Sequence, residues 1–160
     1  VAYSISGLSS IGLRFFNVYG PRQDPHNPYS GVISIFTHKL MNNQPITING
    51  GMQTRDFIFV KDIVQVITKA IHKAKSNNIC ESVNVLTGNS ISIDQLADAL
   101  MKLLEVNGER FYESLPLGDP EESNGSISKL IEILDANPNN FTTIEDGLKL
   151  TIDYIKNGDC

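Results

Sequence analysis

The chain has 160 residues, of which 41% are apolar and 19% are charged. A chain of this length can bury one core but is too short for two comfortable domains, so we expect a single unit spanning residues 1–160. The formal net charge of -5 argues against a nucleic-acid partner, because neutralising a phosphate backbone requires clustered Lys and Arg. A small anionic ligand is compatible with this charge, since only the local potential matters for it.

The cysteine, histidine and hydropathy patterns exclude several other classes of protein. Cys80 and Cys160 lie far apart in the sequence, which indicates neither a disulfide framework nor a metal site and is typical of the reducing cytoplasm. The three histidines have no metal-ligand spacing, so we expect no metal. No apolar run approaches the roughly 18 residues of a membrane span, and the amino end has no signal-peptide pattern. We therefore expect a cytoplasmic protein that has no membrane partner.

The first part of the chain alternates between β-type and helical patterns. Residues 1–10 have the pattern of a helix end or its exit loop, and the prolines between residues 21 and 29 indicate a loop. Aromatic and β-branched runs predict strands, and apolar spacing near 3.6 predicts a helix. In chain order we expect a strand at 12–18, a helix at 31–41, a strand at 45–49, a Gly50-Gly51 turn and a strand at 54–60.

The second part of the chain is richer in helix signals. Asp62 is expected to cap one helix, Ser92 and Gln95 form a capping box for another, and Thr143 caps the last, with Gly158 as its stop. In chain order we expect a helix at 62–75, a strand at 82–86, a helix at 93–104, a strand at 110–114, a polar loop at 116–125 and helices at 126–134 and 144–157. Strands and helices that alternate in this way predict an α/β fold with crossover connections.

Arginines gather beside two of the predicted strands. Arg14, Arg22 and Arg55 are three of the four arginines, and all lie in the first 55 residues. The planar guanidinium suits bidentate recognition of phosphate or carboxylate, although four residues are too few to exclude chance. No strand is followed by a Gly-x-Gly-x-x-Gly loop that could cradle a cofactor phosphate. The sequence thus indicates the anion-binding half of a larger site.

Several segments together resemble a known family. They are residues 12–22, 28–36 and 53–62, followed in the same order by Val83-Asn84-Val85-Leu86-Thr87-Gly88, Gly118-Asp119, Ser128-Lys129 and Ile144-Glu145-Asp146-Gly147-Leu148. The chain resembles the carboxyl-terminal half of extended short-chain dehydrogenase/reductases, specifically the NAD-dependent nucleotide-sugar epimerases and dehydratases of the UDP-glucose 4-epimerase type. The resemblance implies a substrate-binding portion in which residues 1–20 and about 82–88 are strands of the Rossmann sheet. The chain begins at Val1 without Met, and we expect the amino-terminal, cofactor-binding half to be absent from it.

The resemblance also assigns roles to individual residues. It implies that Phe16 lies beside the nicotinamide of NAD, that Asn17 binds the ligand between sugar and diphosphate, and that Arg55 pairs with the diphosphate. Further contacts, to the base or ribose, are implied for Gly31, Val32, Ile48, Asn49, Gly50 and Asp119. Each residue also has a plain structural explanation: a core aromatic for Phe16, a turn for Asn17, an ion pair with Asp56 for Arg55, and capping, turn or solvated positions for the others.

The chain departs from the family pattern at three places. Pro116 stands where an arginine is expected as a second diphosphate clamp, Ser126 replaces an expected aspartate, and the turn at residues 50–53 is one residue short. Arg22 is a candidate to compensate for the missing clamp. No catalytic residue is expected in this chain: Tyr3 is followed by glycine at the position that requires lysine, so the catalytic Tyr-x-x-x-Lys is expected upstream.

The resemblance implies an NAD-dependent UDP-sugar 4-epimerase that acts through a 4-keto intermediate and forms a homodimer. A 4,6-dehydratase is the alternative enzyme, and a non-catalytic sugar-nucleotide-binding module or a purely structural domain are the alternatives of other classes. From these 160 residues alone we expect no epimerase activity and no tight NAD binding. We also expect an exposed apolar face where the other half docks.

Overall fold

The computed structural model describes residues 5–27, 30–76 and 78–157, so Tyr3, Gly158, Cys160 and the first four residues of the helix end or loop expected at 1–10 lie outside it. Helices and strands alternate along the chain, and strand pairs are mostly parallel, which confirms the predicted α/β class. The elements are β1 (Ser10–Phe15), β2 (Asn17–Tyr19), α2 (Val32–Met41), β3 (Ile46–Asn49), β4 (Thr54–Phe59), α3 (Val60–Ser76), β5 (Cys80–Val85), β6 (Ser90–Ser92), α4 (Ile93–Leu104), β7 (Arg110–Glu113), α5 (Ser128–Leu134), the 3-10 helix η1 (Pro138–Asn140) and α6 (Ile144–Lys156).

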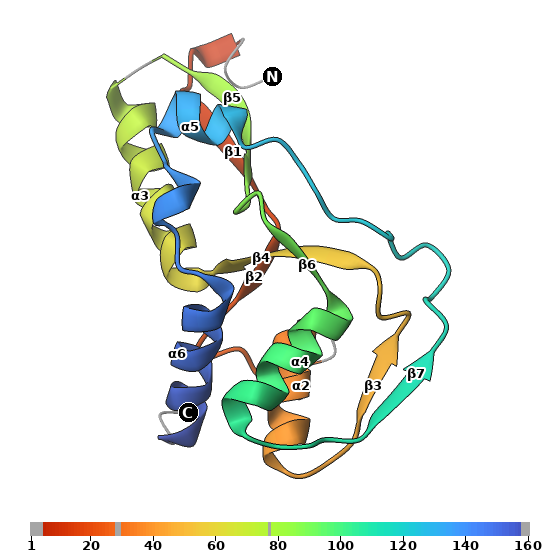
Figure 1. Ribbon diagram of the computed structural model, residues 1–160. Helices are drawn as coiled ribbons and strands as arrows, with labels where there is room; N and C mark the ends of the chain where they lie inside the picture. The colour runs from red at the N-terminus through yellow and green to blue at the C-terminus, as the bar shows by residue number, and fades with distance from the viewer. Residues whose placement is uncertain (1–4, 28–29, 77, 158–160) are drawn as a thin grey trace.

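The single strand predicted at residues 12–18 is two strands, because the chain changes partner at Phe16. β1 pairs in parallel with β5, and the Phe16 N–H still donates to the Val85 carbonyl at 3.1 Å. From Asn17 onward the chain pairs in parallel with β4 instead. This change of partner carries the chain from the upper part of the molecule into the lower part (Figure 1).

β4 is the central strand of a three-stranded sheet. It lies between β2, which is parallel to it, and β6, which is antiparallel. β3 does not pair with β4 across the Gly50-Gly51 turn but forms a separate parallel pair with β7, with Ile48 opposite Tyr112. The turn is therefore no hairpin, because hydrogen bonds between β3 and β4 do not hold it.

Among the predicted helix caps, the one at α4 is confirmed and the one at α3 is wrong. At α4 the Ser92 hydroxyl accepts from the Gln95 N–H at 3.1 Å, and the Gln95 side chain accepts from the Ser92 N–H at 2.8 Å, which confirms the capping box. α3 instead starts at Val60, directly from β4, so Asp62 is not its cap. The buried Asp62 carboxylate accepts from the Thr142 N–H at 2.9 Å and holds the segment before α6.

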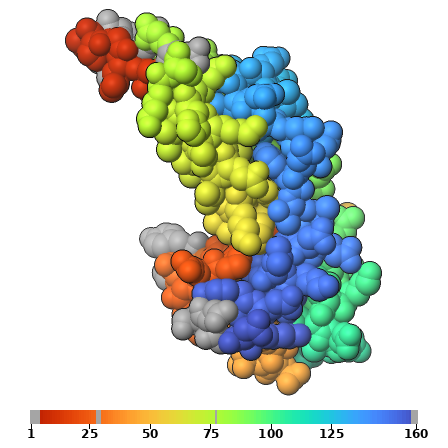
Figure 2. Space-filling view, turned by 90° about the vertical axis from the view of Figure 1, so that its left-hand side faces the viewer, coloured from red at the N-terminus to blue at the C-terminus, as the bar shows by residue number. Residues whose placement is uncertain are grey.

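Buried apolar side chains form two clusters rather than the one core that the chain length suggests. One cluster lies among α2, α4, α6 and the strands beside them, and the other among α3, α5, β1 and β5. Figure 1 shows the second cluster's elements above the first. Figure 2 shows α3 uncovered along one side of the molecule. Val64, Ile67 and Ile71 are exposed on this helix, so an apolar face lies open there.

The part of the chain that the structure describes contains neither a membrane-spanning helix nor a metal-binding cluster. None of its helices combines the length and the apolar composition that crossing a membrane requires. Nor do three or more of its His, Cys, Asp or Glu side chains gather into a group that could hold a metal ion.

Candidate functional site

A cavity of about 410 Å³ lies where β1 gives way to β2, between the first turn of α2, β3, the first half of β4 and the loop around Asp119. Six of the residues assigned to substrate through the family resemblance line this cavity: Asn17, Gly31, Val32, Asn49, Arg55 and Asp119. They come from five separate segments of the chain. Ligands of α/β proteins bind in such crevices beside the ends of parallel strands.

Asn17 forms the floor of the cavity and has a fixed orientation. Its side-chain amide donates to the Asp56 carbonyl at 3.0 Å and to the Ser123 hydroxyl at 3.4 Å. Both bonds use the amide nitrogen, so they tie β2 to β4 and to the segment after Asp119. The amide oxygen is left as the group that can accept a hydrogen bond from a ligand.

Arg55 supplies the positive charge of the cavity. One guanidinium nitrogen donates to the carbonyls of Thr54 and Pro120, both at 2.8 Å. Among the described residues no carboxylate forms an ion pair with Arg55. The alternative of an Arg55–Asp56 pair is wrong, because the Asp56 carboxylate accepts from the Thr87 N–H at 2.9 Å and the Gly88 N–H at 2.7 Å. The guanidinium therefore retains donors for an anion in the cavity.

The first turn of α2 borders the same space. Gly31 is its N-cap residue and has no side chain with which to cap this helix end. Gly31, Val32 and Ile33 all line the cavity. Main-chain N–H groups and the positive end of the helix dipole at such a position favour a negatively charged ligand.

The strand β3 presents alternate residues to the cavity. Thr47 and Asn49 line it, whereas Ile48 between them is fully buried in the lower apolar cluster. Gly50 lies just beyond the lining residues, and its N–H donates to the Glu113 carbonyl at 2.8 Å. The contacts expected from Ile48 and Gly50 would have to come from their main chains, because successive residues of a strand point to opposite faces.

The loop that carries Asp119 reaches the cavity by running beside β4. The Thr54 N–H donates to the Glu121 carbonyl at 2.9 Å, and the Ser123 N–H donates to the Thr54 carbonyl at 3.1 Å. The Asp119 N–H closes a turn on the Pro116 carbonyl at 3.1 Å, and Asp119 is exposed. Pro116 thus shapes the turn at the position where an arginine was expected.

Two expected residues lie away from the cavity. Phe16 is not among its lining residues, and its ring packs beside Gly125, where an added Cβ would lie 2.8 Å from the ring. Arg22 borders a different cavity, with His26, His38 and Tyr154. Arg22 therefore does not replace the missing clamp in this structure.

Sequence reasoning missed several lining residues: Val18, Tyr19, Gln23, Ile33, Phe36, Thr47, Gln53, Phe57 and Ile93. Side chains two residues apart on a strand point to the same face, so the choice of Asn49 could have indicated Thr47 as well.

Tyr19 is almost fully buried, and burial together with the charges of Asp62 and Asp146 raises its pKa. Its hydroxyl therefore stays protonated at neutral pH and donates to the Ile144 carbonyl at 3.4 Å, which is a structural role.

Comparisons with known proteins agree with this geometry. A sequence profile described as the NAD dependent epimerase/dehydratase family matches residues 2–85, just over half of the chain. The putative UDP-glucose 4-epimerase of Methanocaldococcus jannaschii is 34% identical over 152 residues, which are 94% of this chain and 47% of that protein. The chain thus spans about half the length of the relatives that it matches.

Solved structures show the same fold. The UDP-glucose 4-epimerase of Thermotoga maritima, solved with UDP-glucose, is 31% identical with a TM-score of 0.87 over 99% of this chain and 49% of that one. The UDP-glucuronic acid 4-epimerase of Bacillus cereus, solved with UDP-glucuronic acid and NAD, is 28% identical with a TM-score of 0.85, over 97% of this chain and 48% of that one. The profile and the fold together place the chain in the NAD-dependent epimerase/dehydratase family of extended short-chain dehydrogenase/reductases, whose cofactor is NAD.

Proposed function

We propose that this chain forms the nucleotide-sugar-binding portion of an NAD-dependent UDP-sugar 4-epimerase, and that the whole enzyme is a cytoplasmic homodimer. The observation that carries the binding role is the cavity in which Asn17, Arg55 and the uncapped first turn of α2 converge. Arg55, which forms no ion pair with any residue that the structure describes, lies beside a helix N-terminus, and such an arrangement suits a diphosphate.

The ligand would lie across the cavity in a defined direction. In the proposed arrangement the diphosphate pairs with Arg55 and with the N–H groups at the start of α2. The base and ribose lie toward Asn49, Gly50 and the main chain of Ile48, with Asp119 binding ribose hydroxyls. The amide oxygen of Asn17 accepts a hydrogen bond from the part of the ligand between sugar and diphosphate.

The described residues do not by themselves fit a dinucleotide. β4 runs directly into α3 and β6 runs directly into α4, so neither junction has the glycine-rich turn that cradles a cofactor phosphate. Phe16, at the carboxyl end of β1, is the one residue that we propose to meet the nicotinamide. NAD supplies hydride acceptance and return in this family, and we derive no step of that chemistry from the residues described.

The chain's own contribution would be to hold the remote end of the substrate. Binding energy from the nucleoside diphosphate keeps the sugar at the reacting centre. The contacts assigned above bind the UDP portion of the substrate, and none of them fixes the orientation of the hexose. A 4-epimerase needs such freedom, because its 4-keto sugar must present both faces in turn.

The substrate and the product test this proposal together. The natural full-length protein is incubated with UDP-glucose and NAD, and the sugar nucleotides are separated by chromatography. We expect UDP-galactose. A 4-keto-6-deoxy product would indicate a dehydratase instead, binding without turnover would indicate a non-catalytic module, and absence of UDP-sugar binding would contradict the proposal. The 160-residue chain alone is expected to convert no UDP-hexose.

A further inference from the structure

The turn between β3 and β4, residues 49–53, is held in an unusual way. Gly50 and Gly51 both have positive φ, at 80° and 105°. The Gln53 side chain closes the turn: its oxygen accepts from the Gly51 N–H at 2.5 Å, and its nitrogen donates to the Asn49 carbonyl. Asn49 and Gln53 line the cavity, so the conformation of the turn decides where two of its walls lie.

The N-terminus of α4 lies directly against this turn. The Ile93 N–H donates to the Gln53 carbonyl at 3.2 Å, and the Asp94 N–H donates to the Gly51 carbonyl at 3.0 Å. The N–H of the next residue, Gln95, donates to the Ser92 hydroxyl that caps the helix. The first three N–H groups of α4 thus donate to two main-chain carbonyls and one serine hydroxyl, and the helix end holds the turn instead of binding an anion.

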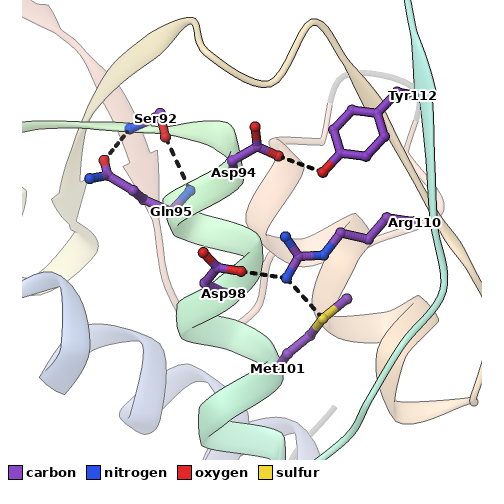
Figure 3. A network of polar contacts seen from close by, with 7 residues as sticks. All are labelled: Ser92, Asp94, Gln95, Asp98, Met101, Arg110 and Tyr112. Carbon is purple, nitrogen blue, oxygen red and sulfur yellow. Dashed lines mark hydrogen bonds and ion pairs between the residues drawn. The ribbon is translucent and has the colours of Figure 1, made fainter.

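The Asp94 carboxylate completes the contact between α4 and the turn, and Figure 3 shows its bond to Tyr112. One oxygen accepts from the Tyr112 hydroxyl on β7 at 3.0 Å. The other faces Gly51 so closely that a Cβ at this glycine would lie 2.6 Å from it. Asp94 is thus placed between Tyr112 and the turn.

We propose that Asp94 and Tyr112 are positioning residues for the nucleotide site: together they hold the turn at residues 49–53 in the conformation that lines the cavity. The inference rests on the proposed function, because it concerns the base and ribose end of the ligand assigned there. Tyr112 is itself exposed and is not a lining residue.

The physical reason is preorganisation. Two consecutive glycines have more conformational freedom than other residues, so an unrestrained turn of this kind would have to be ordered when the ligand binds. That ordering reduces the affinity, and a turn already fixed by Asp94 and Tyr112 avoids the loss. The charge-assisted bond from the Tyr112 hydroxyl to the Asp94 carboxylate is of the stronger kind.

The chain offers a matched control on the same helix. Asp98 lies one turn further along α4 and also pairs with β7, through Arg110 at 2.5 Å, as Figure 3 shows. Arg110 also contacts the Met101 sulfur and interacts with Tyr112, but in the described part of the chain no hydrogen bond runs directly from Asp98 or Arg110 to residues 49–53. Asp94→Ala and Asp98→Ala therefore remove the same side chain from the same helix, and only the first removes a contact to the turn.

The test measures UDP affinity by calorimetry, and hydrogen exchange of the peptide covering residues 46–55 without ligand, in the natural full-length protein. Tyr112→Phe and Asp94→Ala are expected to weaken UDP binding by about fivefold or more and to speed exchange in this peptide. Asp98→Ala is expected to change neither. Because Tyr112 is exposed, Tyr112→Phe decides the question if Asp94→Ala does not fold.

Unchanged UDP affinity in Tyr112→Phe would overturn the inference while leaving the proposed function intact. An equal loss in Asp98→Ala, or faster exchange across β5 as well as the turn, would also overturn it, since the effect would then be on the whole fold. Failure of the wild-type protein to bind UDP would overturn the proposed function, and this inference with it.

Discussion

The side-chain amide of Asn17 donates to the main-chain carbonyl of Asp56 at 3.0 Å, and this bond joins β2 to β4 at the floor of the cavity. The same Asp56 accepts from Thr87 and Gly88 through its carboxylate. Residues from three distant segments thus lie together around Asp56, and the bond to its carbonyl fixes the orientation of the Asn17 side chain.

Asn17→Asp tests this arrangement. The substitution places a carboxylate oxygen where the amide nitrogen now donates, so two acceptors would face one another and the protein should lose about 1 to 3 kcal/mol of stability. UDP affinity should also fall, because a negative charge would enter the cavity. Urea unfolding and calorimetry measure the two effects. Asn89→Asp, at an exposed position outside this cavity, is the control, and equal stability of the two variants would contradict the account.

Gly147→Ala is expected to be strongly destabilising. Gly147 lies in α6, and a Cβ there would be 2.0 Å from the Tyr19 hydroxyl and 3.2 Å from Phe59. Tyr19 lies in the core with its ring against Phe57 and Phe59, so overpacking should cost about 1 to 3 kcal/mol. At Gly12 an added Cβ meets Ser82 at an ordinary 3.4 Å, so Gly12→Ala is the control. Thermal unfolding that shows similar midpoints for both variants would disprove this packing.

Tyr19 makes stability depend on pH in the alkaline range. Burial, followed by the charges of Asp62 and Asp146, raises the pKa of this phenol in the folded state. Its stabilising contribution is therefore fully present below the unfolded pKa of about 10 and is lost as the pH rises through the folded value. Urea unfolding between about pH 8 and about pH 11 should show a steeper loss for wild type than for Tyr19→Phe. Parallel curves would show that Tyr19 does not couple folding to this titration.

The exposed apolar face of α3 should make the 160-residue chain self-associate when it is expressed alone. Val64, Ile67 and Ile71 lie at helical spacing on the uncovered side of this helix. Replacing Ile67 and Ile71 by Gln should shift the sedimentation profile toward monomer. Leu150→Gln, at a similarly exposed position on α6, should not. A strictly monomeric wild-type chain at high concentration would contradict the prediction.

Local signals in the sequence predicted local structure well. The capping box of Ser92 and Gln95 is present as expected, because it depends only on residues three apart. The period of two along a strand could also have excluded the Arg55–Asp56 ion pair, since adjacent side chains of β4 point to opposite faces. Asp56 is buried against the turn at residues 87–88, while Arg55 lines the cavity.

Long-range pairing was beyond the reach of such signals. The change of partner at Phe16 depends on β5, about 70 residues later, and on β4, about 40 residues later. The placement of Arg22 at another cavity depends on how the proline-rich loop packs against α2 and α6, for which no periodicity exists. Asp119 reaches the site only because its loop bonds to Thr54.

The central claim is that the cavity binds a nucleoside diphosphate through Arg55, and calorimetric titration of the natural full-length protein with UDP tests it most directly. Arg55→Ala should weaken binding by about tenfold or more, the loss expected for one charge-assisted bond of about 1.5 to 3 kcal/mol. Arg22→Ala removes the same charge at the other cavity and should leave UDP affinity unchanged. Wild-type affinity in Arg55→Ala, or an equal loss in Arg22→Ala, would contradict the account.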